Sequence, residues 1–198
     1  MTISLRSLVS LALASIRDPR GGAQEVMRMG RGLLDRRQRW EMLALVVVLS
    51  ALLTELTMLL LPAGASLILP LKLGPIAMTL LQFGLMVLTV QAIHWVGRAA
   101  GGKGSLDDAI LLTAWLQAIL LGLQLIQSLA MVLAPPLVSA VTLAGVLLWP
   151  WLMTGFVAAL HGFSSLLKVF AGVVVTSFGV GLALSVILAM IGAVPRGL

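Results

Sequence analysis

Five long apolar segments constrain the fold of this chain more than any other feature of its sequence. Each is long enough to cross about 30 Å of hydrocarbon as a helix, and a helix satisfies its own backbone hydrogen bonds in lipid. Only 10% of the residues are charged, against about 25% in soluble domains. The sequence therefore predicts an all-α, polytopic membrane protein with five transmembrane helices. Their expected bounds are about 40–61, 75–96, 108–133, 136–158 and 167–191.

The first 39 residues form a separate basic segment, because eight of the thirteen Lys and Arg residues precede Trp40. The apolar run over 3–16 is too short to span a bilayer and predicts an interfacial helix. A secretory signal peptide is the alternative, since Ala12-Leu13-Ala14 resembles a cleavage site. It fits less well, because Arg6 interrupts the apolar run and the basic residues follow it. We expect an amphipathic cytoplasmic segment over 1–39 and a transmembrane domain over 40–198.

A second amphipathic helix is predicted after the break at Asp18-Pro19-Arg20-Gly21-Gly22. From Ala23 onward, apolar residues recur at spacings of three and four, with arginines on the other faces. The helix either packs on the bundle or lies among lipid head groups with its basic side on anionic phosphates. The second interpretation is favoured, because the chain enters the membrane directly afterwards. The predicted head-group contacts are Arg28, Arg31, Arg36, Arg37 and Arg39.

Orientation follows from the basic residues in the short loops. With the N-terminus inside, the cytoplasmic face holds the eight N-terminal basic residues plus Arg98, Lys103 and Lys168, which makes eleven. The opposite face holds Lys72 and Arg196. We therefore expect a cytoplasmic N-terminus and an outer C-terminus. A basic segment beside a span is expected to meet anionic lipids rather than nucleic acid.

Glu55 is the one acidic residue deep inside a predicted span. Intramembrane carboxylates are costly and are functional candidates for that reason. A helical rise of about 1.5 Å per residue puts Glu55 level with Gln82 and Gln124, so hydrogen bonds among the three are expected. A structural role, in which protonated Glu55 and the amides hold the helices together, is favoured over a proton-coupled site. The predicted polar cluster consists of Glu55, Gln82, Gln117, Gln124 and Gln127.

The sequence offers no evident site for catalysis, a metal or a cofactor. Cysteines are absent, and His94 and His161 lie in separate segments without a carboxylate cluster. The glycine-rich stretch 101–105 lacks the spacing of a phosphate loop. We expect Ser105 to cap the third span instead, with the Asp108 carboxylate at the positive helix end.

Two connections carry signals of their own. Ala134-Pro135-Pro136 predicts a tight antiparallel hairpin between the third and fourth spans. The outer connection 62–75 is too apolar for a wet loop and too short to cross the membrane. We therefore expect it to dip into the outer interface.

Three motifs are similar to those of a known family. They are Asp18-Pro19-Arg20-Gly21-Gly22-Ala23, Gly101-Gly102-Lys103-Gly104-Ser105-Leu106 and His161-Gly162-Phe163-Ser164. In these motifs the chain resembles the bacterial branch of the Yip family, five-span proteins named for interacting with Ypt/Rab GTPases in eukaryotes. The resemblance implies a cytoplasmic N-terminus and five spans but supplies no catalytic residue. GTPase binding does not carry over, because the eukaryotic N-terminal regions are generally longer.

The expected function is that of a non-enzymatic protein of the bacterial inner (cytoplasmic) membrane that organises the membrane or partner proteins. The expected partners are anionic lipids and another membrane protein or a second copy of the chain, with no cofactor. A small permease or lipid-handling protein with a polar site around Glu55 is the alternative, and an undetected membrane enzyme is a third. A hydrated cavity reaching Glu55 would favour transport, whereas a tightly packed core would favour scaffolding.

Overall fold

The computed structural model describes residues 4–60 and 74–190, and these residues form an all-helical structure. Five helices, α3 to α7, are long and apolar enough to cross a membrane, and two shorter helices precede them. The predicted fold class is therefore confirmed. The helices are α1 (Leu5–Arg17), α2 (Pro19–Leu33), α3 (Arg36–Leu60), α4 (Pro75–Ala99), α5 (Leu106–Leu133), α6 (Val138–His161) and α7 (Leu166–Met190), with a 3-10 turn (Pro135–Leu137) before α6.

The expected spans agree with these helices to within a few residues. The largest difference is at α3, which begins at Arg36 rather than near residue 40, because the basic residues continue the helix outward. The tight hairpin at Ala134 is present as the 3-10 turn. The expected span ends at 61 and 191, the outer connection 62–75 and the C-terminal Arg196 lie outside the described residues.

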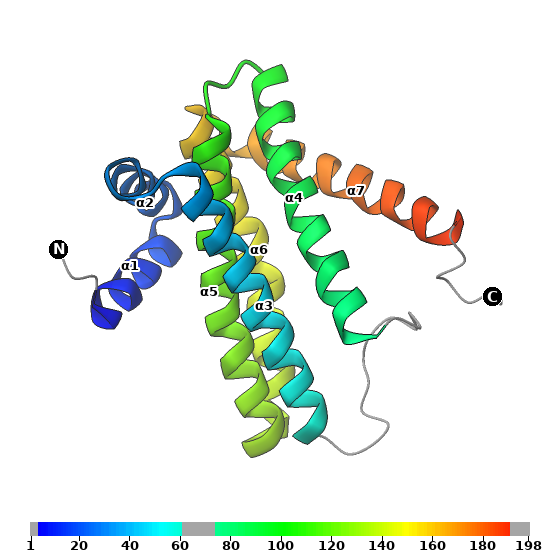
Figure 1. Cartoon of the computed structure of the whole chain (residues 1–198). Coiled ribbons are helices and arrows are strands. Elements are labelled where there is room, and N and C mark those ends of the chain that lie inside the picture. The colour runs from blue at the N-terminus through cyan, green and yellow to red at the C-terminus, as the bar shows by residue number, and fades with distance from the viewer. Residues whose placement is uncertain (1–3, 61–73, 191–198) are drawn as a thin grey trace.

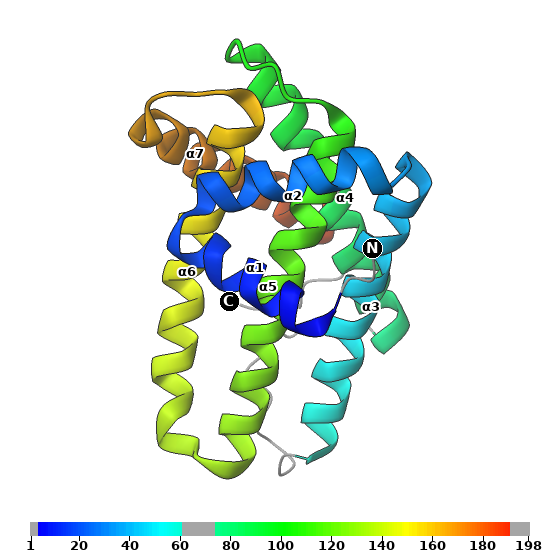
Figure 2. The same cartoon turned by 90° about the vertical axis from the view of Figure 1, so that its left-hand side faces the viewer.

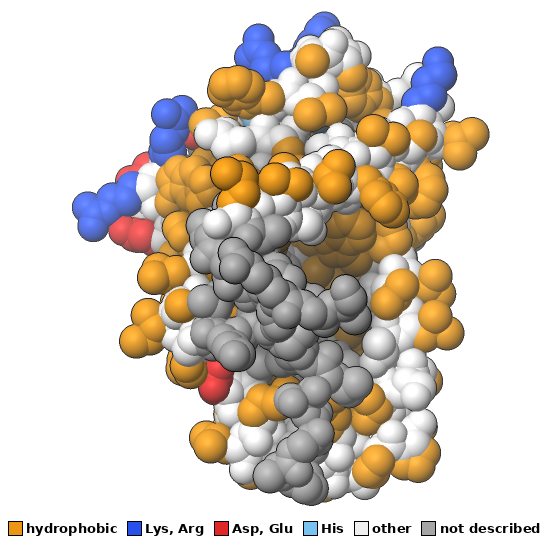
Figure 3. All heavy atoms as spheres, turned by 90° about the vertical axis from the view of Figure 1, so that its right-hand side faces the viewer, with side chains coloured by type: hydrophobic (Ala, Val, Ile, Leu, Met, Phe, Trp, Pro, Cys, Tyr) orange, Lys and Arg blue, Asp and Glu red, His pale blue; other side chains and the backbone are white. Residues whose placement is uncertain are grey.

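Helices α3, α5 and α6 run side by side, and α4 leans against them (Figures 1 and 2). Helix α7 leaves this bundle at a steep angle and packs mainly on α6 (Figure 1). We call the end where α3, α5 and α7 begin and where α4 and α6 finish the basic end. Figure 3 shows Lys and Arg side chains gathered at one end, with hydrophobic side chains over much of the face below.

Helices α1 and α2 form a unit docked across the side of the bundle near the basic end (Figure 2). One face of α2 is buried against α5 and α6, which confirms its amphipathic pattern. That face packs on protein rather than on lipid, so the favoured interpretation is wrong about what covers it. The buried residues are Pro19, Gly22, Ala23, Val26, Met27 and Gly30.

The break between α1 and α2 is confined to one residue. Asp18 is extended, and its carboxylate accepts a hydrogen bond from the Gly21 N–H at 3.1 Å. Pro19 fits the first helical position, where no N–H is needed. Gly21 and Gly22 therefore already belong to α2, and the predicted five-residue break is too long. A Cβ on Gly22 would lie 2.6 Å from the Ser15 Cα, so only glycine allows α1 this close.

The hydrophobic core lies at the basic end rather than at the middle of the bundle. Every residue of α5 from Asp108 to Leu116 is buried, with α2, α3, α4 and α6 packed around it. Beyond Ile119 the apolar side chains of α5 are largely exposed, as lipid-facing residues are. The 28 residues of α5 extend about 42 Å, more than the hydrocarbon thickness. The extra turns provide the surface on which α2 docks.

Candidate functional site

A buried ion cluster joins the docked unit to the bundle. Asp108 is only 4% exposed and lies in the first turn of α5. Its N–H donates to the Ser105 hydroxyl at 3.1 Å, so the predicted cap is confirmed. Its carboxylate accepts from Arg39 Nη1 at 3.2 Å and from Arg31 Nη2 at 2.8 Å. Asp108 therefore binds the end of α2 and the start of α3 to α5.

Arg39 is a structural residue in this cluster, not a head-group contact. It is 5% exposed, and its Nη2 donates to the Gly30 carbonyl at 3.1 Å. Its Nε donates to the Leu34 carbonyl at 3.3 Å. Both carbonyls lie at the end of α2, and the Gly30 carbonyl also accepts from the Leu34 N–H at 3.0 Å. The predicted head-group contact of Arg39 is therefore wrong. A single sequence shows the charge of a residue but not that it pairs with a carboxylate far away along the chain.

The other four arginines are exposed and also have carboxylate partners. Arg36 pairs with Asp107 at 2.6 Å. Arg37 pairs with Glu41 one turn along α3, and Arg28 pairs with Glu25 on α2, each at 2.7 Å. The Arg28 hydrogen bond lowers the pKa of Glu25 below its ordinary value. For Arg28, Arg31, Arg36 and Arg37, contact with lipid phosphates stays a prediction.

His161 ties three segments together at the same end. Its Nδ1 accepts from the Gly104 N–H at 3.2 Å. The other nitrogen, Nε2, lies 3.1 Å from the Ile93 carbonyl and donates to it, which requires the neutral ring. A Cβ at Gly97 or Gly102 would collide with the imidazole. Gly97, Gly102 and Gly104 thus make room for a buried histidine. No pattern in the sequence indicated this pairing.

A ladder of hydrogen bonds joins α3 to α5 in the far half of the bundle. Gln124 Nε2 donates to Thr54 Oγ1 at 2.8 Å and to the Ser50 carbonyl at 3.0 Å. The Ser50 hydroxyl donates back to Gln124 Oε1 at 2.6 Å. One turn further on, the hydroxyls of Thr57 and Ser128 share a hydrogen bond of 2.8 Å. The α3 residues recur at the i, i+4, i+7 spacing of one helix face, which is a sequence signal for the side of α3 toward α5.

The hydrogen bonds predicted for Glu55 are not formed. Glu55 is exposed, and within the described residues its side chain makes no hydrogen bond with Gln82 or Gln124. Thr54 faces Gln124 instead, and the following residue of a helix points about 100° away. That part of the prediction is therefore wrong. Gln82 is half-buried and has no side-chain hydrogen bond to any residue that the structure describes.

The remaining glutamines make separate contacts between helices. Gln117 Nε2 donates to the Met86 sulfur of α4 at 2.8 Å. Gln127 Nε2 donates to the Thr142 hydroxyl of α6 at 3.0 Å. The five predicted residues thus do not form one polar layer. Three of the glutamines act as isolated links from α5 to its neighbours.

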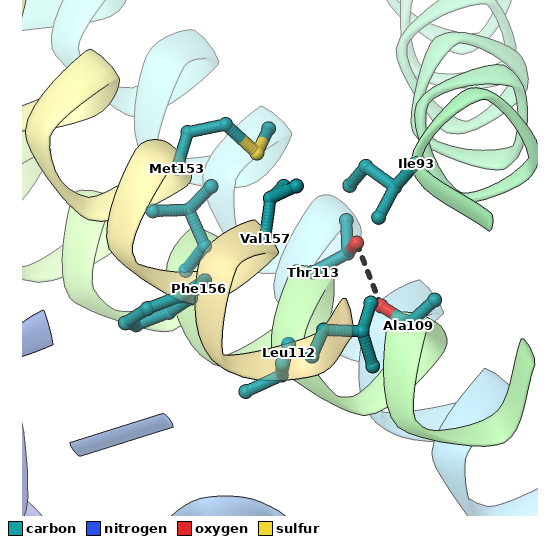
Figure 4. A pocket seen from close by; sticks show the side chains of 9 residues that line it. Ile93, Ala109, Leu112, Thr113, Met153, Phe156 and Val157 are labelled. Carbon is teal, nitrogen blue, oxygen red and sulfur yellow. Dashed lines mark hydrogen bonds between the residues drawn. The ribbon is translucent and has the colours of Figure 1, made fainter. Parts of the chain in front are cut away.

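The space between α4, α5 and α6 near the basic end is apolar and almost filled (Figure 4). Its cavity measures about 10 Å³, which is about the space of a single water molecule. Ile93, Met153 and Phe156 are among the side chains that line it (Figure 4). The Thr113 hydroxyl donates to the Ala109 carbonyl of its own helix at 2.8 Å and offers nothing to a solute. This part of the described structure contains no hydrated path.

Metal ligation has no support within residues 4–60 and 74–190, where no group of three His, Asp or Glu side chains could hold an ion. His94 is half-buried, and its Nδ1 has no partner among the described residues. What the site can do chemically is therefore to hold helices together and to present basic side chains.

The family model for the Yip1 domain matches residues 13–188. The match runs from the second half of α1 into α7. It therefore includes the docked helix α2, the ion cluster and all five apolar helices. No curated protein and no solved structure matches the chain.

Proposed function

Because the chain belongs to the Yip1 domain family, we propose that it is a non-enzymatic membrane protein that organises the bacterial inner membrane, or partner proteins within it, from the cytoplasmic side. The family and the five apolar helices make it an integral membrane protein of the Yip type. The organising role and the partners are the proposed part. The partners proposed are anionic lipids and another membrane protein or a second copy of the chain.

The observation that carries this proposal is the exposed apolar side of α1 in the docked unit. Leu5, Val9 and Leu13 are each more than half exposed. The other side of α1 is fixed to the bundle, because Trp115 Nε1 donates to the buried Ser15 hydroxyl at 3.1 Å. An amphipathic helix with such a surface inserts at the border of head groups and acyl chains. Held there on one side of the bundle only, it adds area to one leaflet and favours curvature.

Reconstitution of the full chain into vesicles tests the organising role. We expect vesicles to become smaller or tubular as the protein content rises, which electron microscopy measures directly. The double substitution Leu5→Gln and Val9→Gln should abolish this effect without unfolding the chain, since both side chains are exposed. Ser7→Gln with Ser10→Gln is the matched control on exposed positions of the same helix. Equal vesicle shapes for the two double variants would overturn the proposal.

The proposed orientation puts the basic end in the cytoplasm. This end, where α3 begins with Arg36, also holds Arg98 at the end of α4, Lys103 between α4 and α5, and Lys168 in the first turn of α7. Such an excess of basic residues is typical of cytoplasmic loops. The sequence has no cysteine, so single cysteines report topology without background. We expect Lys103→Cys to react with an impermeant thiol reagent only after the membrane is opened. A cysteine at Gly74, at the other end of α4, should react in intact cells.

The alternative of a permease around Glu55 finds no support in the described residues. Glu55 does not join the amides of the bundle, and the space between α4, α5 and α6 is apolar. The packed core at the basic end would block a solute on that side. Uptake of small solutes by reconstituted vesicles should therefore equal that of protein-free vesicles.

A further inference from the structure

A crevice of about 690 Å³ opens where the junction of α1 and α2 meets α6 and the first turns of α7. Figure 2 shows this junction beside α6, with the start of α7 nearby. The rim carries two guanidinium groups, those of Arg17 and Arg20. One wall is apolar and exposed. It is formed by Leu147, Trp151, Leu167 and Phe170.

Unpartnered polar atoms lie in the residues that line this crevice. The Thr154 side chain is 7% exposed, and its hydroxyl has no hydrogen-bond partner among the described residues. The same holds for Arg20 Nε, although Arg20 Nη2 donates to the Phe163 carbonyl at 2.6 Å. Buried groups of this kind ordinarily have partners, which points to an occupant.

The charge of the rim selects the chemistry of that occupant. Arg17 is exposed and has no ion pair within the described part of the chain. Asp18 is the acidic residue in the lining, and one of its oxygens is engaged by the Gly21 N–H. Two guanidinium groups against one carboxylate favour an anion, and guanidinium geometry suits phosphate. A free inorganic ion would leave the apolar wall beside them uncovered, whereas a ligand with a hydrocarbon chain would contact it.

We propose that this crevice binds one anionic phospholipid, with its phosphate between Arg17 and Arg20 and an acyl chain along Trp151 and Phe170. The Trp151 indole is fixed for this role, because its Nε1 donates to the Ile16 carbonyl at 3.0 Å. The lipid would bridge the docked unit and α7, adding to the hydrogen bonds of Arg20 with the Phe163 and Ser164 carbonyls just before α7. This site rests on the proposed function, since it names a lipid that the docked unit would hold.

Native mass spectrometry of the full chain from nanodiscs with equal amounts of phosphatidylglycerol and phosphatidylcholine tests this site. We expect one phosphatidylglycerol to remain bound in preference to phosphatidylcholine. Arg17→Gln should reduce that retention about fivefold, the effect of one basic residue beside anionic lipid. Arg6→Gln, an equal change of charge at an exposed position of α1 outside the crevice, should leave retention unchanged.

Three results would overturn the lipid site: equal retention of the two lipids, equal losses for both arginine variants, or complete displacement by inorganic phosphate. The last would show a simple anion site. Because retention is measured without reference to vesicle shape, the lipid site and the organising role can fail separately.

Discussion

The basic end and the far half of the bundle are held together by different interactions. At the basic end α5 is surrounded by four helices and joined to two of them by a buried ion cluster. In the far half the helices expose most of their apolar surface, and α3 and α5 meet through hydroxyl and amide groups such as Ser50, Thr54 and Gln124. The contrast lies within single helices, because α3, α5 and α6 contribute to both regions.

The environment explains this difference. Burying apolar side chains is favourable only where water would otherwise reach them, and lipid tails remove that driving force within the hydrocarbon layer. Burial of a core of leucine, methionine and phenylalanine therefore stabilises the protein most at the membrane interface, where α2 shields that core from water. In the far half, small polar residues that pair across helices give the association its direction. Four substitutions, ordered by expected effect, examine this division.

The largest loss of stability is expected for Asp108→Asn. The change keeps the size of the side chain but leaves Arg39 as a buried charge without a carboxylate. Breaking a buried pair in this way costs about 3–5 kcal/mol, and we expect the lower end because two carbonyls still accept from Arg39. Equilibrium unfolding in mixed micelles measures the free energy.

The neighbouring Asp107→Asn is the control for that change. It removes an equal charge from the same helical turn, but its partner Arg36 is exposed, and exposed pairs contribute about 0–1 kcal/mol. If the two variants lose equal stability, the buried cluster does not hold the basic end together.

An intermediate effect is expected for Gly22→Ala. The added Cβ would lie 2.6 Å from the Ser15 Cα, so α1 and α2 must separate, and overpacking of this kind costs about 1–3 kcal/mol. Gly32→Ala in the last turn of α2 meets nothing within 4 Å and should be neutral or stabilise by about 0.5 kcal/mol. Proteolysis within α1 should accelerate in the first variant only. Equal protection would mean that the docked unit tolerates the added carbon.

A smaller loss is expected for Gln124→Leu in the far half. It removes the bonds to Ser50 and Thr54, and interhelical hydrogen bonds in membrane proteins contribute about 0.6 kcal/mol on average and up to about 1.7 kcal/mol. Gln82→Leu is the matched substitution, since this amide bonds no other described residue. It should change the free energy of unfolding by less than Gln124→Leu does. The reverse order would show that the far half is not held by the α3–α5 ladder.

Sequence patterns predicted the helices well because span length and hydropathy are local properties. The same patterns could not predict what each helix face contacts. The spacing in α2 correctly marked an apolar face, yet α5 and α6 cover it, and the partners of Asp108 lie far away along the chain. The cap at Ser105 was predictable because both partners fall within one turn.

The error at Glu55 has a specific geometric origin. Matching heights along parallel helices gives no information about rotation around each helix axis. The stripe of Ser50, Thr54 and Thr57 carried that information, since the i, i+4, i+7 spacing marks the face of α3 toward α5. Glu55 follows Thr54 directly and therefore points off that face.

The smallest effect is expected for Glu55 itself. An exposed side chain that bonds neither Gln82 nor Gln124 should tolerate Glu55→Gln with a change in unfolding free energy within about 0.5 kcal/mol. Glu55→Leu distinguishes a lipid-facing position of this side chain from an interior, hydrogen-bonded one. On a face toward lipid, leucine replaces a costly carboxyl group and should leave stability equal or raised. In an interior hydrogen-bonded position the same change should cost about 1 kcal/mol. A loss of that size, measured beside Gln124→Leu in the same micelles, would mean that Glu55 lies inside the bundle and adds another hydrogen bond between the helices. An unchanged or raised stability would confine the ladder to the stripe that faces α5.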